Sequence, residues 1–162
     1  MEIKRLQAEH IPWVAPLAAD FRVTLNSFKR ILSVPDLAAG AEELQEYLNR
    51  KDPVFMALSD SHCAGYMVCR IEEPCVWVES LFVARPYRRQ GVATLLFHEA
   101  EAIAASYGAD TAFNYVHPNN DTMIAFLRKN GYTVLNLIEI RKPYKGEKLS
   151  STICVGEHPF DY

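Results

Sequence analysis

The chain has 162 residues, of which 49% are hydrophobic and 23% are charged, so its length and composition suit one compact domain with a sizeable core. The formal net charge of −3 disfavours nucleic acid as a partner, because binding phosphates requires a basic face. No apolar run reaches the roughly 18 residues of a membrane helix, and no signal-peptide core follows Met1, which predicts a cytoplasmic protein without a membrane partner.

The first half of the chain predicts one strand, two helices and then an antiparallel meander. In chain order these elements are a strand at residues 2–7, a helix at 11–30 with Pro12 in its first turn, a helix at about 38–50, and strands at 54–58, 64–71 and 75–83. The last three runs are apolar and rich in strand-forming residues, and short polar turns separate them. Short turns favour antiparallel pairing of consecutive strands.

The second half alternates helices and strands. It predicts a loop at 85–91, a helix from Val92 that Gly108 ends, a strand at 111–116, a helix closed by Gly131, and strands at 132–140 and 151–155. Two helical crossovers favour at least one parallel strand pair with a right-handed connection. The predicted fold class is therefore α/β, with a mixed, mostly antiparallel central sheet flanked by helices.

The four cysteines, Cys63, Cys69, Cys75 and Cys154, do not predict a metal site. None belongs to a Cys-x-x-Cys pair, and no histidine lies at zinc-finger spacing. We interpret each as a small buried hydrophobe in a reducing compartment, and the alternative is a reactive thiol.

The most informative stretch joins the strand that ends at Val83 to the helix that begins at Val92. The first N–H groups of a helix have no internal partner, and the helix dipole places partial positive charge there. A loop that turns these groups inward forms an anion site suited to a pyrophosphate, which small residues at Gly91 and Ala93 would let approach the backbone. The alternative is an ordinary loop with solvated arginines. The loop has neither a Walker motif nor the Gly-x-Gly-x-x-Gly spacing of a dinucleotide site.

Two motifs in this half resemble the signatures of the GNAT superfamily of acetyl-CoA-dependent N-acetyltransferases. Arg88-x-x-Gly91-x-Ala93 is similar to the family's Gln/Arg-x-x-Gly-x-Gly/Ala, and the run from Asn120 to Tyr132 resembles its second signature. The resemblance covers about residues 75–141. It implies a single N-acetyltransferase domain over 1–162, with the coenzyme A core at about 75–141 and the acceptor site shaped by 1–70 and the C-terminal segment.

The resemblance also implies which residues bind acetyl-CoA, the co-substrate. Backbone groups of the strand end would hold the pantetheine arm as another strand would, the loop would wrap the pyrophosphate, and Asn120 would hydrogen-bond the arm or serve only as a helix N-cap. The implied cofactor residues are Leu81, Phe82, Val83, Arg88, Arg89, Gln90, Gly91, Val92, Ala93, Thr94 and Asn120.

Acetylation needs a neutral amine, so a positioned base would help. Glu79 is the candidate, because a carboxylate within an apolar strand is costly unless it is solvated or paired; the alternatives are a solvent-facing glutamate or one that binds a cationic acceptor. The carbonyl could be polarised by the Val83 N–H. Leucine stands at Leu127, where the family often has a general-acid tyrosine.

Three interpretations of Leu127 remain open. The thiolate, with a thiol pKa near 8.5, leaves without an acid; or Tyr115, His117 or Tyr132 substitutes; or turnover has been lost. The leading hypothesis is therefore an N-acetyltransferase that acts on a small-molecule or peptide amine. The alternatives are a non-catalytic acetyl-CoA-binding regulatory domain and a nucleotide-binding protein that uses the same loop. An edge strand near the C-terminus could pair two copies as a homodimer.

Overall fold

The computed structural model describes residues 1–162, which form two units, Met1–Ala125 and Phe126–Tyr162. The first unit contains β1 (Glu2–Arg5), η1 (Ala8–His10), α1 (Ile11–Phe28), α2 (Leu37–Asn49), β2 (Val54–Ser59), β3 (His62–Glu72), β4 (Cys75–Val83), η2 (Arg85–Tyr87), α3 (Val92–Ser106) and β5 (Phe113–Asn114). Helix α4 (Asp121–Lys129) spans the boundary, and the second unit contains β6 (Thr152–Val155) and β7 (His158–Asp161).

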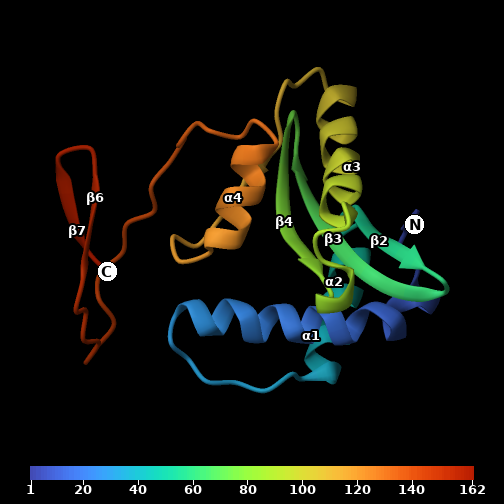
Figure 1. Cartoon of the computed structure of the whole chain (residues 1–162), viewed down its shortest axis with the longest axis horizontal. Helices are drawn as coiled ribbons and strands as arrows, with labels where there is room; N and C mark the ends of the chain where they lie inside the picture. Colours follow the sequence, from blue (N-terminus) through green and yellow to red (C-terminus); the bar gives the residue numbers. More distant parts are fainter. The chain divides into compact units, whose positions relative to one another are not determined.

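Five strands form the sheet of the first unit, in the order β1-β2-β3-β4-β5, and Figure 1 labels the three central ones, β2, β3 and β4. The first three pairings are antiparallel, and β4 pairs with β5 in parallel. The prediction of a mixed, mostly antiparallel sheet flanked by helices is thus confirmed. The parallel pair is short, because only Trp77–Phe113 and Val78–Asn114 are in register.

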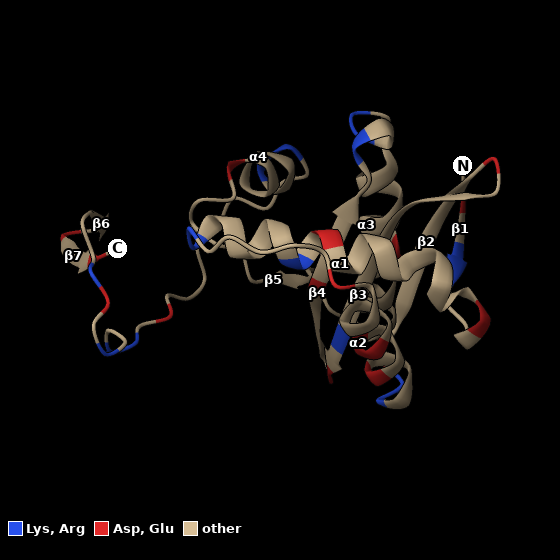
Figure 2. Ribbon diagram, turned by 90° about the horizontal axis from the view of Figure 1, so that it is seen from below, with Lys and Arg blue, Asp and Glu red and all other residues tan.

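Helices α1 and α2 pack together and cover one face of the sheet. Pro12 lies in the first turn of α1, as predicted, and the Asp36 carboxylate caps α2 by accepting from the Ala39 N–H (3.0 Å). The two helices cross so closely that a Cβ built on Gly40 would lie 2.6 Å from the Ala15 carbonyl oxygen. Their buried residues share a core with Tyr66 of β3, and α1 lies across β3 and β4 in Figure 2.

Helix α3 covers the opposite face of the sheet, where it packs on β2, β3 and β4 (Figure 1). Its buried residues recur at helical spacing: Val92, Leu96, Phe97, Ala100 and Ala104. Gly65 of β3 lies beneath it, and a Cβ there would meet the Phe82 carbonyl oxygen at 2.8 Å and Leu96 Cδ1 at 3.4 Å. A glycine at this position therefore lets β3, β4 and α3 come together.

Three predicted segments differ from the structure. The strand expected at 111–116 is only Phe113–Asn114, and the loop at 85–91 contains the 3-10 helix η2. Residues 132–140 form no strand, although their apolar pattern predicted one. A strand needs a neighbouring strand for its backbone hydrogen bonds, and this segment pairs with none in the structure.

The predicted strand at 151–155 is present as β6. Its partner β7 was not predicted; the two pair antiparallel, joined by the turn at Gly156 and Glu157, where Gly156 has φ +61°. A Gly-x dipeptide between two short strand-like runs is a hairpin signal, so the sequence held a clue to this strand.

All four cysteines are free thiols. Cys69 is buried, and desolvation raises the pKa of its thiol to about 12. Cys154 is exposed and Cys63 and Cys75 are only partly buried, so the interpretation of each cysteine as a buried hydrophobe is confirmed for Cys69 alone. None of the helices combines the length and the apolar character needed to cross a membrane.

Candidate active site

The loop between β4 and α3 presents a row of unpaired backbone donors. Gly91, with φ +84°, is the N-cap of α3, and its carbonyl oxygen accepts from the Leu95 N–H (3.0 Å). None of the N–H groups from Arg89 to Thr94 donates a hydrogen bond within the protein. Arg89 also has a positive φ, +63°, so two left-handed residues flank Gln90. The geometry is that of an anion site at a helix N-terminus.

Two side chains of the same loop turn back and brace it. Arg88 Nε donates to the Val83 carbonyl oxygen (2.8 Å), while its guanidinium lies 5.4 Å from the centre of the Phe82 ring. Gln90 Nε2 donates to the Pro86 carbonyl oxygen (2.8 Å). Arg88 and Gln90 thus hold the loop against the end of β4. Arg89 takes no part in these contacts and is exposed, so its guanidinium is available to a ligand.

Strands β4 and β5 diverge after their two paired residues and form a fork. Beyond Val78 of β4 and Asn114 of β5, no strand borders the last residues of β4 on that side. The Ala84 N–H donates to the Ala64 carbonyl oxygen (2.9 Å), which fixes the antiparallel alternation of β3 and β4. Leu81 and Val83 therefore direct their backbone N–H and C=O groups away from β3, into the fork.

A β-bulge lies at the base of the fork. Val78 pairs with Cys69 and Ser80 pairs with Val68, so Glu79 is the extra residue of β4. The Glu79 side chain meets Arg70 of β3, with Arg70 Nε 3.3 Å from Glu79 Oε2. The bulge thus brings the predicted base to the fork, where it is paired with a cation rather than exposed to solvent alone.

The other two catalytic candidates lie in different surroundings. The Tyr115 ring stacks on Trp77, with 4.6 Å between centroids and 9° between planes. The His117 ring stacks on Phe28 at the C-terminal end of α1 (5.7 Å, 18°), and burial together with nearby Lys29 lowers the pKa of His117. Tyr115 thus packs on Trp77, whose ring lies under the Arg70 guanidinium that pairs with Glu79, while His117 packs against α1.

Asn120 and the residues discussed with Leu127 are placed as follows. Asn120 Oδ1 accepts from the Met123 N–H (3.1 Å), so Asn120 is the N-cap of α4, which was one of its two predicted roles. Leu127 and Tyr132 belong to the second unit, where the Tyr132 N–H donates to the Leu127 carbonyl oxygen (3.0 Å).

Sequence reasoning missed two residues of this site, Arg70 and Trp77. They pair across β3 and β4, and the Arg70 guanidinium lies 5.7 Å from the Trp77 ring centre. Trp77 precedes Glu79 by two positions, which in a strand places both on one face and was an available signal. Trp77 Nε1 and Asn114 Oδ1 are buried without a hydrogen-bond partner in the protein, as are the hydroxyls of Tyr66 and Ser80.

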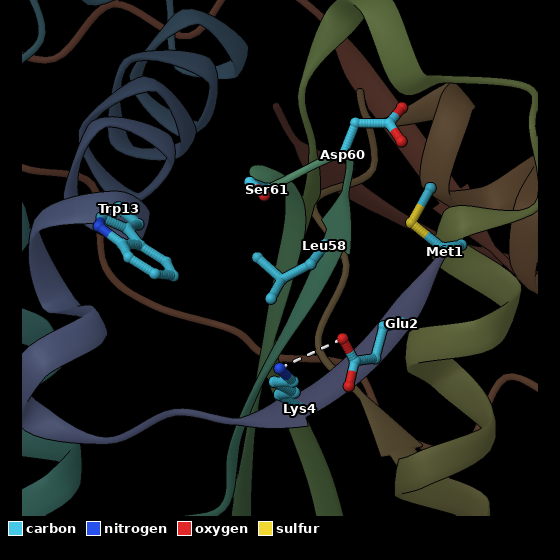
Figure 3. A pocket seen from close by; sticks show the side chains of 7 residues that line it. All are labelled: Met1, Glu2, Lys4, Trp13, Leu58, Asp60 and Ser61. Carbon is cyan, nitrogen blue, oxygen red and sulfur yellow. Dashed lines mark ion pairs between the residues drawn. The ribbon is translucent and has the colours of Figure 1, made fainter.

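A separate cavity lies away from the fork. A pocket of about 360 Å³ opens at the opposite edge of the sheet, beside β1 and the β2–β3 turn. Figure 3 shows Trp13 of α1 facing Leu58 across it, with the ion pair of Lys4 and Glu2 (3.2 Å) beside them. We separate this pocket from the fork, because α3 and its unpaired N–H groups are not part of its lining.

The sheet, the fork and the anion-binding loop together define a class of acyl-transferring enzymes, and comparison with known proteins identifies the family. Residues 21–132 match the acetyltransferase (GNAT) family, so the chain belongs to this family. It is therefore an acyltransferase, and its acyl donor is acetyl-CoA. No curated protein matches the chain by sequence.

Solved structures share the fold. A probable acetyltransferase is 20% identical with a TM-score of 0.72, over 91% of this chain and 100% of its own. An aminoglycoside antibiotic 6'-N-acetyltransferase from Acinetobacter haemolyticus is 21% identical with a TM-score of 0.66, over 90% and 100%. PaiA N-acetyltransferase from Thermoplasma acidophilum, solved with coenzyme A, is 21% identical with a TM-score of 0.66, over 80% and 87%.

Proposed function

We propose that this chain transfers the acetyl group of acetyl-CoA to a primary amine, of a small molecule or of a protein or peptide, by direct attack of the amine. One observation carries the proposal: the fork between β4 and β5 opens beside the unpaired N–H groups that begin α3. A thioester held along the fork and a diphosphate bound at the helix start match the two ends of one coenzyme A molecule.

Within this proposal, the last residues of β4 bind the pantetheine arm. Leu81 and Val83 offer backbone groups to it as a neighbouring strand would. Because Arg88 already donates to the Val83 carbonyl oxygen, the arm relies on the Val83 N–H and on Leu81. The segment from Arg89 to Thr94 wraps the diphosphate, and the Asn120 side chain adds a hydrogen bond to the arm alongside its role as N-cap.

The chemical step needs a neutral amine, whose usual pKa is about 10.4 for an alkylamine and about 8 for an α-amine. Glu79 accepts the amine proton, directly or through a water molecule, and Arg70 orients its carboxylate. The amine nitrogen forms the bond to the acetyl carbon as the carbon–sulfur bond breaks, and the proton that this nitrogen then loses passes to Glu79 or to water. Leu127 donates no proton, so either Tyr115, His117 or Tyr132 protonates the departing sulfur, or coenzyme A leaves as the thiolate.

Four wider expectations belong to the same proposal. The whole chain, residues 1–162, acts as one N-acetyltransferase domain, with its coenzyme A core at about 75–141. The acceptor site involves 1–70 and the C-terminal segment. The protein acts in the cytoplasm. A homodimer forms through an edge strand near the C-terminus.

The test is thiol release by the full-length chain. Purified protein is mixed with acetyl-CoA and a panel of polyamines, aminoglycosides, amino acids and peptides, and free coenzyme A thiol is measured with a chromogenic disulfide. We expect release that depends on both protein and amine. Stabilisation of the chain by coenzyme A without thiol release from any amine would favour the non-catalytic alternative. Stabilisation by ATP but not by coenzyme A would overturn the cofactor assignment.

A further inference from the structure

We propose that Trp77, Tyr115 and the carboxylates beside them form a platform that selects amine acceptors carrying a second positive charge. This inference rests on the proposed acetylation of an amine at the same fork. It adds a substrate class: diamines, polyamines and other molecules with several amino groups.

The platform is a stack of side chains that runs across three strands. Arg70 of β3 lies over the Trp77 ring (5.7 Å), and Trp77 of β4 stacks on Tyr115, the residue that follows β5 (4.6 Å). Phe113 packs against Trp77 as well (4.9 Å). Tyr115 ends the stack and remains 61% exposed, although it is a large aromatic residue. Its outer side is therefore available to one more partner, and the stack already holds a guanidinium against an aromatic face.

The charged side chains around the platform include one more carboxylate than guanidinium group. Arg70 pairs with both Glu72 and Glu79, and the nearby Arg50 pairs with Asp52 (2.7 Å). Two cations thus face three carboxylates, a net charge of −1. An ammonium group complements this charge, whereas a carboxylate or phosphate would be repelled.

The platform lies where an acceptor must enter. Glu79 and Tyr115 are the first residues of β4 and of the β5 segment beyond the last paired residues, Val78 and Asn114, so they stand on the two sides of the fork. Arg70 and Trp77 pair across β3 and β4 and share a face. An acceptor that reaches the thioester between the strands therefore passes these side chains.

Acetylation itself explains why the second charge matters. The amino group that attacks must be neutral, so it gains nothing from an aromatic face or an extra carboxylate once it has lost its proton. A second amino group on the same molecule stays protonated at pH 8, because its pKa is about 10. That group can remain on the platform throughout the reaction and hold the acceptor in place.

A matched pair of amines tests the platform. The full-length enzyme is assayed at pH 8 with 1,5-diaminopentane and with pentylamine, which differ by one charge at equal chain length. We expect kcat/KM to favour the diamine by about tenfold. Tyr115→Ala should reduce the ratio of kcat/KM for the diamine to that for pentylamine by about tenfold, whereas Tyr115→Phe should retain this ratio because the ring remains. Glu72→Gln should lower the preference, since it removes the surplus charge.

Each result decides one point. Equal kcat/KM values for the two amines in the unmodified enzyme, or an undiminished preference in Tyr115→Ala, would overturn the platform while leaving acetyl transfer intact. A hundredfold fall in kcat for Tyr115→Phe would make Tyr115 the general acid and overturn its role as a platform. No thiol release from any amine, with coenzyme A still bound, would instead overturn the proposed function. The Kd of each variant for coenzyme A verifies that it is folded.

Discussion

Arg70 and Glu79 form an ion pair across β3 and β4, with Arg70 Nε 3.3 Å from Glu79 Oε2, at the point where a bulge interrupts the register of the two strands. Both side chains are about one-third exposed, at 32% and 33%. The bulge inserts Glu79 between two paired residues, at the point where the pairing of β4 with β5 ends, and its carboxylate meets Arg70 of β3 there. The pair therefore links the proposed chemistry to a local feature of the sheet.

Glu79→Gln should lower kcat by about a hundredfold, because the amide cannot accept the amine proton. The remaining rate should rise about tenfold per pH unit toward the amine pKa of about 10.4, since the variant can use only amine that is already neutral. Steady-state kinetics from pH 6 to pH 10 measures both effects. Glu42→Gln, on the exposed side of α2, is the matched control and should leave kcat unchanged. Normal kcat in Glu79→Gln would remove this residue from the chemistry.

Gly91→Glu should weaken coenzyme A binding by more than tenfold while the fold is retained. A Cβ at Gly91 meets no atom within 4 Å, so the substitution clashes with nothing in the protein, but its carboxylate would face the diphosphate. The φ of +84° adds about 1 kcal/mol of backbone strain for any side chain. Gly91→Gln has the same strain and bulk without the charge, so calorimetric Kd values for the two variants separate the causes. A Kd for Gly91→Glu equal to that of the unmodified protein would refute the loop assignment.

Gly65→Ala should destabilise the protein by about 1–3 kcal/mol, because the added methyl group would meet the Phe82 carbonyl oxygen at 2.8 Å and backbone cannot rotate away. Moving β4 would also displace the groups of Leu81 and Val83 in the fork, so the KM for acetyl-CoA should rise. Urea unfolding and steady-state kinetics measure the two effects. An unchanged free energy of unfolding in Gly65→Ala would show that β3 and β4 can move apart at this position without destabilising the protein.

Stability should fall between pH 10 and pH 12 in a way that depends on Tyr47. Burial, and then the Glu43 carboxylate that accepts from its hydroxyl (2.9 Å), raise the pKa of Tyr47 from 10.0 to about 12. Below pH 10 the hydroxyl is protonated in both folded and unfolded chains, so its contribution is complete. Above pH 10 the unfolded chain ionises first, and about 2 kcal/mol is lost by pH 12.

Tyr47→Phe tests this linkage. The variant should be less stable than the unmodified protein at pH 8 by about 1–2 kcal/mol, because the Glu43 carboxylate loses a donor. The difference between the two free energies of unfolding should narrow at pH 11, where ionisation of Tyr47 in the unfolded chain lowers the stability of the unmodified protein. Urea unfolding followed by circular dichroism at both pH values measures the free energies. A difference that stays constant with pH would show that Tyr47 ionises alike in both states.

Local patterns predicted the elements on which we propose the coenzyme A site. The strand ending at Val83, the turn at Gly91 and the helix from Val92 each depend on residues close in sequence, so composition and periodicity located them to within a few residues. Asn120 offered a helix cap that the structure confirms by its contact with Met123.

Pairings between distant residues could not be predicted in the same way. The register of β3 against β4 decides that Glu79 is bulged and that Arg70 faces it. The residues next to Arg70 and Glu79 in the sequence do not predict this register. The alternating apolar residues at 132–140 favoured a strand, but a strand also needs an available edge, which local sequence does not report. For the same reason the stack of Trp77 on Tyr115 was visible only once β4 and β5 were paired.

The close crossing of α1 and α2 at Gly40 has a consequence for recognising related chains. Even a methyl group at Gly40 would press on the Ala15 backbone, so a substitution would force α1 and α2 apart. The core that these helices form with Tyr66 would then have to repack. A glycine in the first turn of the second helix can therefore be used in genome searches to recognise chains with this helix pair. Chains that carry a larger residue at the equivalent place should have these two helices farther apart.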